Sequence, residues 1–221
     1  MRLLPILVLL LLSGVSRPGF AQDSPRPVGP DFRFPDGLYL SHAALLALRP
    51  DAPLGEIGGE MVRLDADRTL KIADYAGPEN RRPYAVVVAG LPYLNVAGPR
   101  DGDFLTFAGL QQLGALSHMS YDTTVQTRTL MRAYNPVNGR PFREGWVERD
   151  RTRRLERILD LRSGQRYPFD LATVRRLCAD DRDLRAALDR AQPTETDKLR
   201  RALRIHSARY PLSLPLFVLN R

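Results

Sequence analysis

The hydrophobic positions of this chain follow two different periods. Between residues 56 and 134, apolar side chains alternate with polar ones or form short apolar runs, which is typical of β-strands. From residue 170 onward they recur every three or four positions, which is typical of amphipathic helices. The pattern predicts a sheet followed by helices, and therefore an α+β fold.

The predicted sheet is mainly antiparallel and meander-like, because its strand segments follow one another with short turns between them. Its strongest segment, residues 84–89, is apolar on both faces and is expected to be central. Asp122 is expected in a connection between two strands, and residues 134–139 in a loop. The other predicted strands cover residues 37–40, 61–64, 69–75, 93–96, 104–107, 113–121 and 124–134.

Turn and cap residues predict the elements outside this sheet. Residues 157–161 and 165–167 flank a turn and are expected to form a hairpin, whereas the form of residues 148–154 stays open. Ser41 is expected to cap a short N-terminal helix over residues 42–48.

Three helices are expected at the C-terminal end. The first covers residues 171–178, the second ends near Arg190 and the third near Arg209. The apolar segment 212–219 is expected to dock on the body, since an exposed one would favour aggregation. The predicted N-terminal caps of the three helices are, in order, Asp170, Asp180 with Asp183, and Thr194 with Asp197.

Residues 1–21 have the form of a secretory signal. Arg2 precedes an apolar run over residues 3–12. Gly19 and Ala21 provide small side chains at the two positions before the cleavage site that the pocket of a signal peptidase accepts. We therefore expect cleavage after Ala21 and an exported protein, periplasmic or secreted. The apolar run is too short for an uncleaved membrane anchor, and no transmembrane segment is expected in the mature chain.

The mature chain is expected to hold one folded unit behind a leader. Residues 22–35 contain four prolines and few apolar side chains, which predicts a flexible Pro-rich leader. Residues 36–221 are long enough for a single α+β domain with one core. A boundary near Gly139, between a β domain and a helical domain, is the alternative.

The composition is that of an ordinary globular protein, with 43% hydrophobic and 26% charged residues. The single cysteine, Cys178, excludes an internal disulfide framework. A buried, inert thiol is the expected state of Cys178. A reactive thiolate would need an electropositive setting, which neighbours such as Arg175, Arg176 and Arg182 could provide.

The chain is basic, and its positive charge lies in the C-terminal half. Residues 22–125 carry 9 basic and 13 acidic residues, whereas residues 126–221 carry 22 and 12. This favours an anionic partner such as envelope lipid phosphates, acidic polysaccharide or the protein's own acidic half, while export argues against genomic nucleic acid. The candidate polyanion-binding residues are Arg149, Arg151, Arg153, Arg154, Arg157, Arg200, Arg201 and Arg204.

A second interpretation of the arginines involves no binding. Of the 33 basic residues, 31 are arginine, which is what a general preference for arginine over lysine would produce. Arginines interleaved with Asp and Glu are then solvated surface with weak ion pairs.

His118 is the candidate for catalysis, with Asp122 or Tyr121 as its partner in a small hydrolase or lyase. Residues four apart on a strand share a face but lie about 13 Å apart, so a direct bond to Asp122 needs a bend. The alternative is that His118 is a polar residue at a strand end beside a turn. His206 is expected to be packed and hydrogen-bonded, and His42 to start a helix.

Metal and cofactor sites are not predicted. The histidines do not stand at the spacing of a zinc site, and the acidic turns lack the ligands of a calcium loop. The glycines of residues 55–59 are not followed by the Lys-Ser/Thr of a phosphate loop.

Three short stretches carry a resemblance: residues 37–45 (GLYLSHAAL), residues 92–96 (PYLNV), and residues 158–164 (ILDLRSG) leading into 177–181 (LCADD). In their order they resemble a group of exported bacterial proteins of unassigned function. That group commonly begins its mature part with Gly-hydrophobic-Tyr and ends with a Leu-Asp-Leu, turn glycine and helical segment. The resemblance implies secretion and one small domain, and implies no reaction.

The sequence presents no matched nucleophile, base and orienting residue. It therefore predicts a non-enzymatic binding or structural module of the cell envelope. The hydrolase built on His118 and the polyanion-binding protein are the two alternatives.

Overall fold

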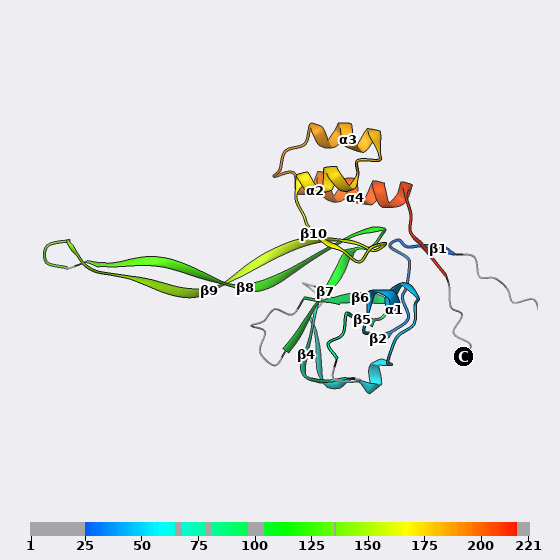
Figure 1. The fold of residues 1–221 in the computed structure, drawn as a ribbon, viewed down its shortest axis with the longest axis horizontal. Helices are drawn as coiled ribbons and strands as arrows, with labels where there is room; N and C mark the ends of the chain where they lie inside the picture. The colour runs from blue at the N-terminus through cyan, green and yellow to red at the C-terminus, as the bar shows by residue number, and fades with distance from the viewer. Residues whose placement is uncertain (1–24, 65–67, 78–80, 97–103, 135, 216–221) are drawn as a thin grey trace, which may run out of the picture.

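The computed structural model describes residues 25–64, 68–77, 81–96, 104–134 and 136–215. The predicted signal segment and its cleavage site lie outside these residues. Most of the described chain forms antiparallel sheet, curled into a half-barrel, and the three C-terminal helices gather at one end of it (Figure 1). The expected α+β class, with a mainly antiparallel sheet, is confirmed at this level.

Within the described residues, the main sheet has nine strands, and every pairing is antiparallel. The order is β10-β9-β8-β7-β6-β5-β2, with β4 on β7 and β3 on β4. The bounds are β2 Gly37–Tyr39, β3 Gly58–Leu64, β4 Thr69–Ala76, β5 Ala85–Val88, β6 Leu91–Asn95, β7 Phe104–Gln112, β8 Leu116–Tyr134, β9 Pro141–Asp160 and β10 Arg166–Pro168.

β5, predicted to be central, instead lies next to the short edge strand β2. Its apolar character has another cause, because both of its faces are covered. Val87 packs in one buried cluster with Tyr39 and Leu94, whereas Val86 packs in another with Phe107.

The prediction of a flexible leader is wrong for residues 25–35. β1 (Arg26–Pro27) pairs with β11 (Ser213–Leu214), which ties this segment to the C-terminal end. Val28, Phe32 and Phe34 are buried between the prolines, so three side chains supply enough apolar surface to hold the segment on the core. Burial of Leu214, with Leu212 packed beside it, also confirms docking of the C-terminal tail over residues 212–214.

Four α-helices lie in the described chain: α1 His42–Leu46, α2 Leu171–Leu177, α3 Arg182–Asp189 and α4 Thr196–Arg209, with a 3₁₀ turn at Leu54–Glu56. The predicted caps Ser41 and Asp170 are confirmed. Asp181, not Asp180, caps α3, because Asp180 bonds to the ring of His206. The predicted Thr194 cap is also wrong, since α4 begins after Glu195 without a side-chain cap.

Helices α2, α3 and α4 form a small layer over one end of the sheet (Figure 1). Leu116 on β8 and Ile158 on β9 belong to the same buried cluster as Val174, Leu199 and Leu203 of the helices. This contact fixes α4 beside the start of β8 and the end of β9, which are the two longest strands.

Those two strands form a single long hairpin. The predicted break at Asp122 is wrong, because β8 continues through it and pairs with β9 over its whole length. The undecided residues 148–154 belong to β9, and Gly139 lies in the turn of this hairpin rather than between two units.

The outer part of the hairpin, residues 121–134 and 141–155, is named the arm here. Among the described strands, its residues pair only with one another. It projects away from both the half-barrel and the helices (Figure 1), over about 40 Å at the usual rise per residue of a strand.

Candidate functional site

A polar cluster surrounds Glu156 at the root of the arm, between the sheet and α4. Glu156 lies on β9, directly opposite Ser120 and diagonal to His118 of β8. His118 Nε2 lies 3.0 Å from Glu156 Oε2. The His118 ring is 1% exposed and meets the ring of Phe169 edge-on at 4.6 Å between centroids.

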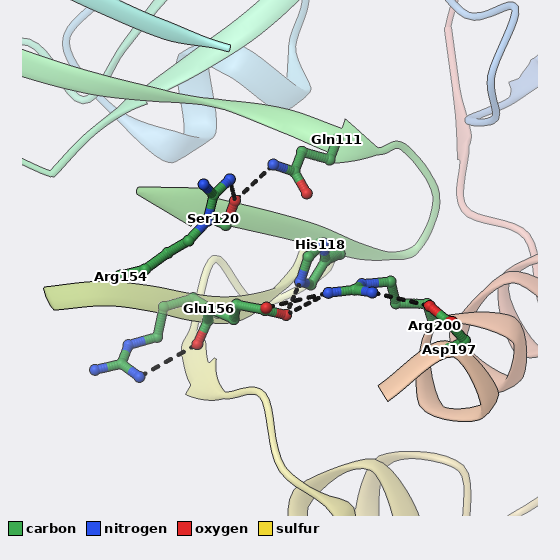
Figure 2. A network of polar contacts seen from close by, with 8 residues as sticks. Gln111, His118, Ser120, Arg154, Glu156, Asp197 and Arg200 are labelled. Carbon is green, nitrogen blue, oxygen red and sulfur yellow. Dashed lines mark hydrogen bonds and ion pairs between the residues drawn. The ribbon is translucent and has the colours of Figure 1, made fainter. Parts of the chain in front are cut away.

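The same carboxylate binds an arginine from the helix layer. Arg200 of α4 donates to both carboxylate oxygens of Glu156, at 3.1 and 3.0 Å, and its other terminal nitrogen donates to Asp197 at 3.0 Å. Figure 2 shows Glu156 lying between His118 and Arg200. Glu156 therefore links β8, β9 and α4 through charge-assisted hydrogen bonds.

Burial lowers the pKa of His118 below its ordinary value, more than the neighbouring Glu156 raises it, and Arg200 and Arg154 lower it further. A lowered pKa leaves the ring neutral at pH 7. Because the ionised Glu156 can only accept, the ring proton is assigned to Nε2.

This cluster does not assemble a catalytic triad. Ser120, on the same face as His118, accepts hydrogen bonds from Gln111 at 2.5 Å and from Arg154 at 3.0 Å (Figure 2). Both lone pairs of its hydroxyl are therefore occupied by other donors. The arrangement joins strands and a helix, and orients no nucleophile toward His118.

The expected partners of His118 lie elsewhere. Asp122 is four residues along the same unbroken strand, and Tyr121 points to the opposite face, toward the core of the half-barrel. Both line a cavity of about 300 Å³, whereas His118 lies at the wall of a different one of about 780 Å³. The predicted pairing of His118 with Asp122 or Tyr121 is wrong, because β8 runs unbroken through these residues and the partner of His118 is Glu156.

His42 begins α1, as expected. His206 is buried and bonded to Asp180, also as expected. The buried state predicted for Cys178 is confirmed, and burial, with Asp180 and Asp181 nearby, raises the pKa of its thiol to about 12.

The strand register divides the charges of the arm between its two faces. Residues with odd numbers share one face, named the arginine face here. It carries four arginines and, over residues 121–133 and 143–155, no carboxylate. Its directly opposed pairs are Thr123–Arg153, Val125–Arg151, Thr127–Arg149, Thr129–Val147, Met131–Gly145 and Ala133–Arg143.

The even-numbered face is nearly balanced. It has three arginines, Arg128, Arg132 and Arg154, against four carboxylates, at Asp122, Glu144, Glu148 and Asp150. Arg132 Nε lies 2.7 Å from Glu144, and Gln126 donates to Glu148 at 2.9 Å. The charges of this face are therefore largely neutralised by one another.

The arginines predicted to bind a polyanion therefore do not form one surface. Arg149, Arg151 and Arg153 lie together on the arginine face, whereas Arg154 is on the other face and bonds to Ser120. Arg157 is half-buried at the root and donates to the Glu156 carbonyl at 3.3 Å.

The helix arginines form no equivalent row. Arg200 is engaged with Glu156, while Arg201 and Arg204 are exposed on α4. Arg204 lines the cavity of about 780 Å³ together with Arg33 and Arg68. The guanidinium groups of Arg33 and Arg68 already donate to backbone carbonyls, which leaves them fewer donors for an added anion.

Reasoning from the sequence missed two residues, one of the arginine face and one of the polar cluster. Arg143 belongs to the arginine face, and its odd number would have shown this if the hairpin register had been known. Glu156 was not singled out from the sequence, because its partner His118 is 38 residues away.

No cluster of potential metal ligands occurs among the described residues, and no helix of that part of the chain is long and apolar enough to cross a membrane. No protein family, curated protein or solved structure matches this chain. The resemblance to exported bacterial proteins of unassigned function therefore stays a prediction.

Proposed function

We propose that this protein is an exported, non-enzymatic binding module that holds an anionic partner along the arginine face of its arm. The observation that carries the proposal is the unequal division of charge between the two faces. The arginine face carries four arginines and no carboxylate. The even-numbered face carries three arginines and four carboxylates. A general preference for arginine would not by itself separate the carboxylates in this way.

The spacing of these arginines suits an extended partner. Arg149, Arg151 and Arg153 alternate along β9, so neighbouring side chains lie about 7 Å apart on one face. Guanidinium groups bind phosphates, sulfates and carboxylates through paired hydrogen bonds. A row of such groups fits a polymer or a surface that carries repeated anionic groups.

The projection of the arm supports this function. Beyond its inner end, where Tyr121 packs on the half-barrel core, the arm projects away from the half-barrel and the helices (Figure 1), so the outer part of the arginine face can reach a partner much larger than the protein. The export predicted from residues 1–21 would bring it to the lipid phosphates and acidic polysaccharides of the envelope.

The test compares two variants that remove the same charge from opposite faces. Arg149→Gln, Arg151→Gln and Arg153→Gln are combined in the first, and Arg128→Gln, Arg132→Gln and Arg154→Gln in the control. Binding is measured as retention on immobilised heparin in increasing NaCl. We expect the first variant to elute at lower salt and with a weaker salt dependence than the control, because each arginine that binds an anionic group of the polymer releases counterions from it.

Equal elution of the two variants would show that only net charge matters, and would refute the proposal. So would a wild-type protein that heparin does not retain at low salt. Circular dichroism spectra that match the wild type establish that both variants are folded.

A further inference from the structure

The end of the arm exposes an apolar patch. Of the nine large hydrophobic side chains that are most exposed in the described chain, five lie between residues 130 and 146. They are Leu130 (39% exposed), Met131 (44%), Tyr134 (55%), Val137 (91%) and Trp146 (57%). This group is named the tip patch here.

The geometry of the arm explains why these side chains are not buried. Leu130 and Trp146 are directly opposed on the even-numbered face, Met131 is on the arginine face, and Val137 lies in the turn. A two-stranded ribbon has no second layer against which either face could pack. The patch therefore surrounds the end of the arm and does not form a stripe along one side.

The same end of the arm is positively charged. Residues 130–146 contain Arg132, Arg140 and Arg143 against the single carboxylate of Glu144, a net charge of +2. Arg128, two residues inward along β8, lies over the Trp146 ring at 5.1 Å from its centroid. Exposed Trp and Tyr beside arginine are the combination that occupies the boundary between headgroups and acyl chains of a membrane.

We infer that the tip patch enters the headgroup region of an anionic lipid surface, end-on, with the arginines nearest the turn, Arg140 and Arg143, on the lipid phosphates. This inference rests on the proposed function and names the anionic partner as lipid. Anionic headgroups attract the positive end of the arm, and the interface takes up the apolar side chains that the ribbon leaves in water.

Other occupants fit less well. A second copy of the chain would bring two positively charged tips together, at an electrostatic cost. An acidic polysaccharide would satisfy the arginines but would leave Leu130 and Val137 in water. An anionic lipid surface binds the arginines through its phosphates and also removes the exposed apolar side chains from water.

The chain provides its own probe, because Trp146 is its only tryptophan. The full chain is mixed with vesicles of phosphatidylcholine alone or with phosphatidylglycerol added. With the anionic vesicles we expect Trp146 emission to move to shorter wavelength and acrylamide to quench it less. Neutral vesicles should produce little change, since the positive end of the arm is then not attracted.

A matched pair of variants separates the tip patch from apolar surface in general. Leu130→Ser with Val137→Ser removes two exposed apolar side chains but leaves Trp146 and every arginine. Val62→Ser with Leu64→Ser removes two others, 44% and 43% exposed, from β3 outside the arm. We expect roughly tenfold weaker partition to anionic vesicles for the first pair, and wild-type partition for the second.

Three results would overturn the inference: no spectral change with anionic vesicles, an equal change in the tip variant, or a change that needs no lipid and rises with protein concentration, which indicates self-association. Retention on heparin tests the proposed function independently of these measurements. A protein that binds heparin through the arginine face but leaves Trp146 unchanged on vesicles would refute only the lipid partner.

Discussion

His118 and Glu156 lie on adjacent strands, with the ring Nε2 3.0 Å from the carboxylate, and their contact is the point at which the arm joins the helix layer. Arg200 of α4 completes the link by binding the same carboxylate.

Replacing His118 by glutamine should reduce the dependence of stability on pH. The pKa of His118 is lowered in the folded state, so the folded protein binds fewer protons than the unfolded one between that pKa and 6.5. Stability should therefore fall as the pH drops from 6.5 and level off below the folded pKa. The amide of the introduced glutamine can still donate to Glu156 but does not titrate.

Urea unfolding at several pH values between 5 and 8 measures this effect. Relative to His118→Gln, the wild type should lose stability as the pH falls from 8 to 5, so the effect of the ring's titration is absent at pH 8 and largest at pH 5. A wild-type curve that runs parallel to that of the variant would contradict the assignment.

Glu156→Ala should lower the free energy of unfolding by about 1–3 kcal/mol, because the buried N–H of His118 then has no acceptor in the cluster. The control is Glu148→Ala, on the exposed part of the arm, which should cost about 0.5 kcal/mol or less. Chemical denaturation of both variants at pH 8 gives the comparison. Equal losses would show that Glu156 has no special structural role.

Gly114→Ala should separate α4 from the sheet. An added Cβ would lie 2.7 Å from Cβ of Ser207 and 2.8 Å from its hydroxyl, which exchanges hydrogen bonds with the backbone of Leu116. We expect a loss of about 1–3 kcal/mol, typical of overpacking.

The matched control for this change is Gly145→Ala on the arm, where an added Cβ meets nothing within 4 Å. That substitution should be neutral or slightly stabilising, because Ala loses less backbone entropy than Gly. Thermal unfolding of the two variants distinguishes the outcomes, and a Gly114→Ala protein as stable as wild type would show that α4 shifts without cost.

Cys178 should resist alkylation in the folded protein. Its thiol is buried and has a pKa raised to about 12, so the reactive thiolate is scarce at pH 8. Mass spectrometry after iodoacetamide treatment should find the thiol unmodified in buffer and modified in urea. Rapid modification without denaturant would show that the helix layer opens easily.

Local features were predictable from the sequence. Ser41 and Asp170 were recognised as caps because each acts on the first turn that follows it, within three residues. The hairpin of β3 and β4 was likewise visible in its alternation. Asp180 shows the limit of such reasoning: it is spaced like a cap but bonds to His206, 26 residues away.

The sequence by itself determined the strand pattern of residues 124–134 and the excess of arginine in residues 126–221, but left the form of residues 148–154 open. Only the tertiary structure decided that residues 121–134 and 141–155 pair with each other alone, which leaves both faces in water beyond the inner end of the arm. Only the register gathers Arg143, Arg149, Arg151 and Arg153 on one face. The physical reason is that the side-chain period of a strand is two. Which arginines share a face therefore depends on the pairing of strands across a turn, and not on the spacing of charges along the chain.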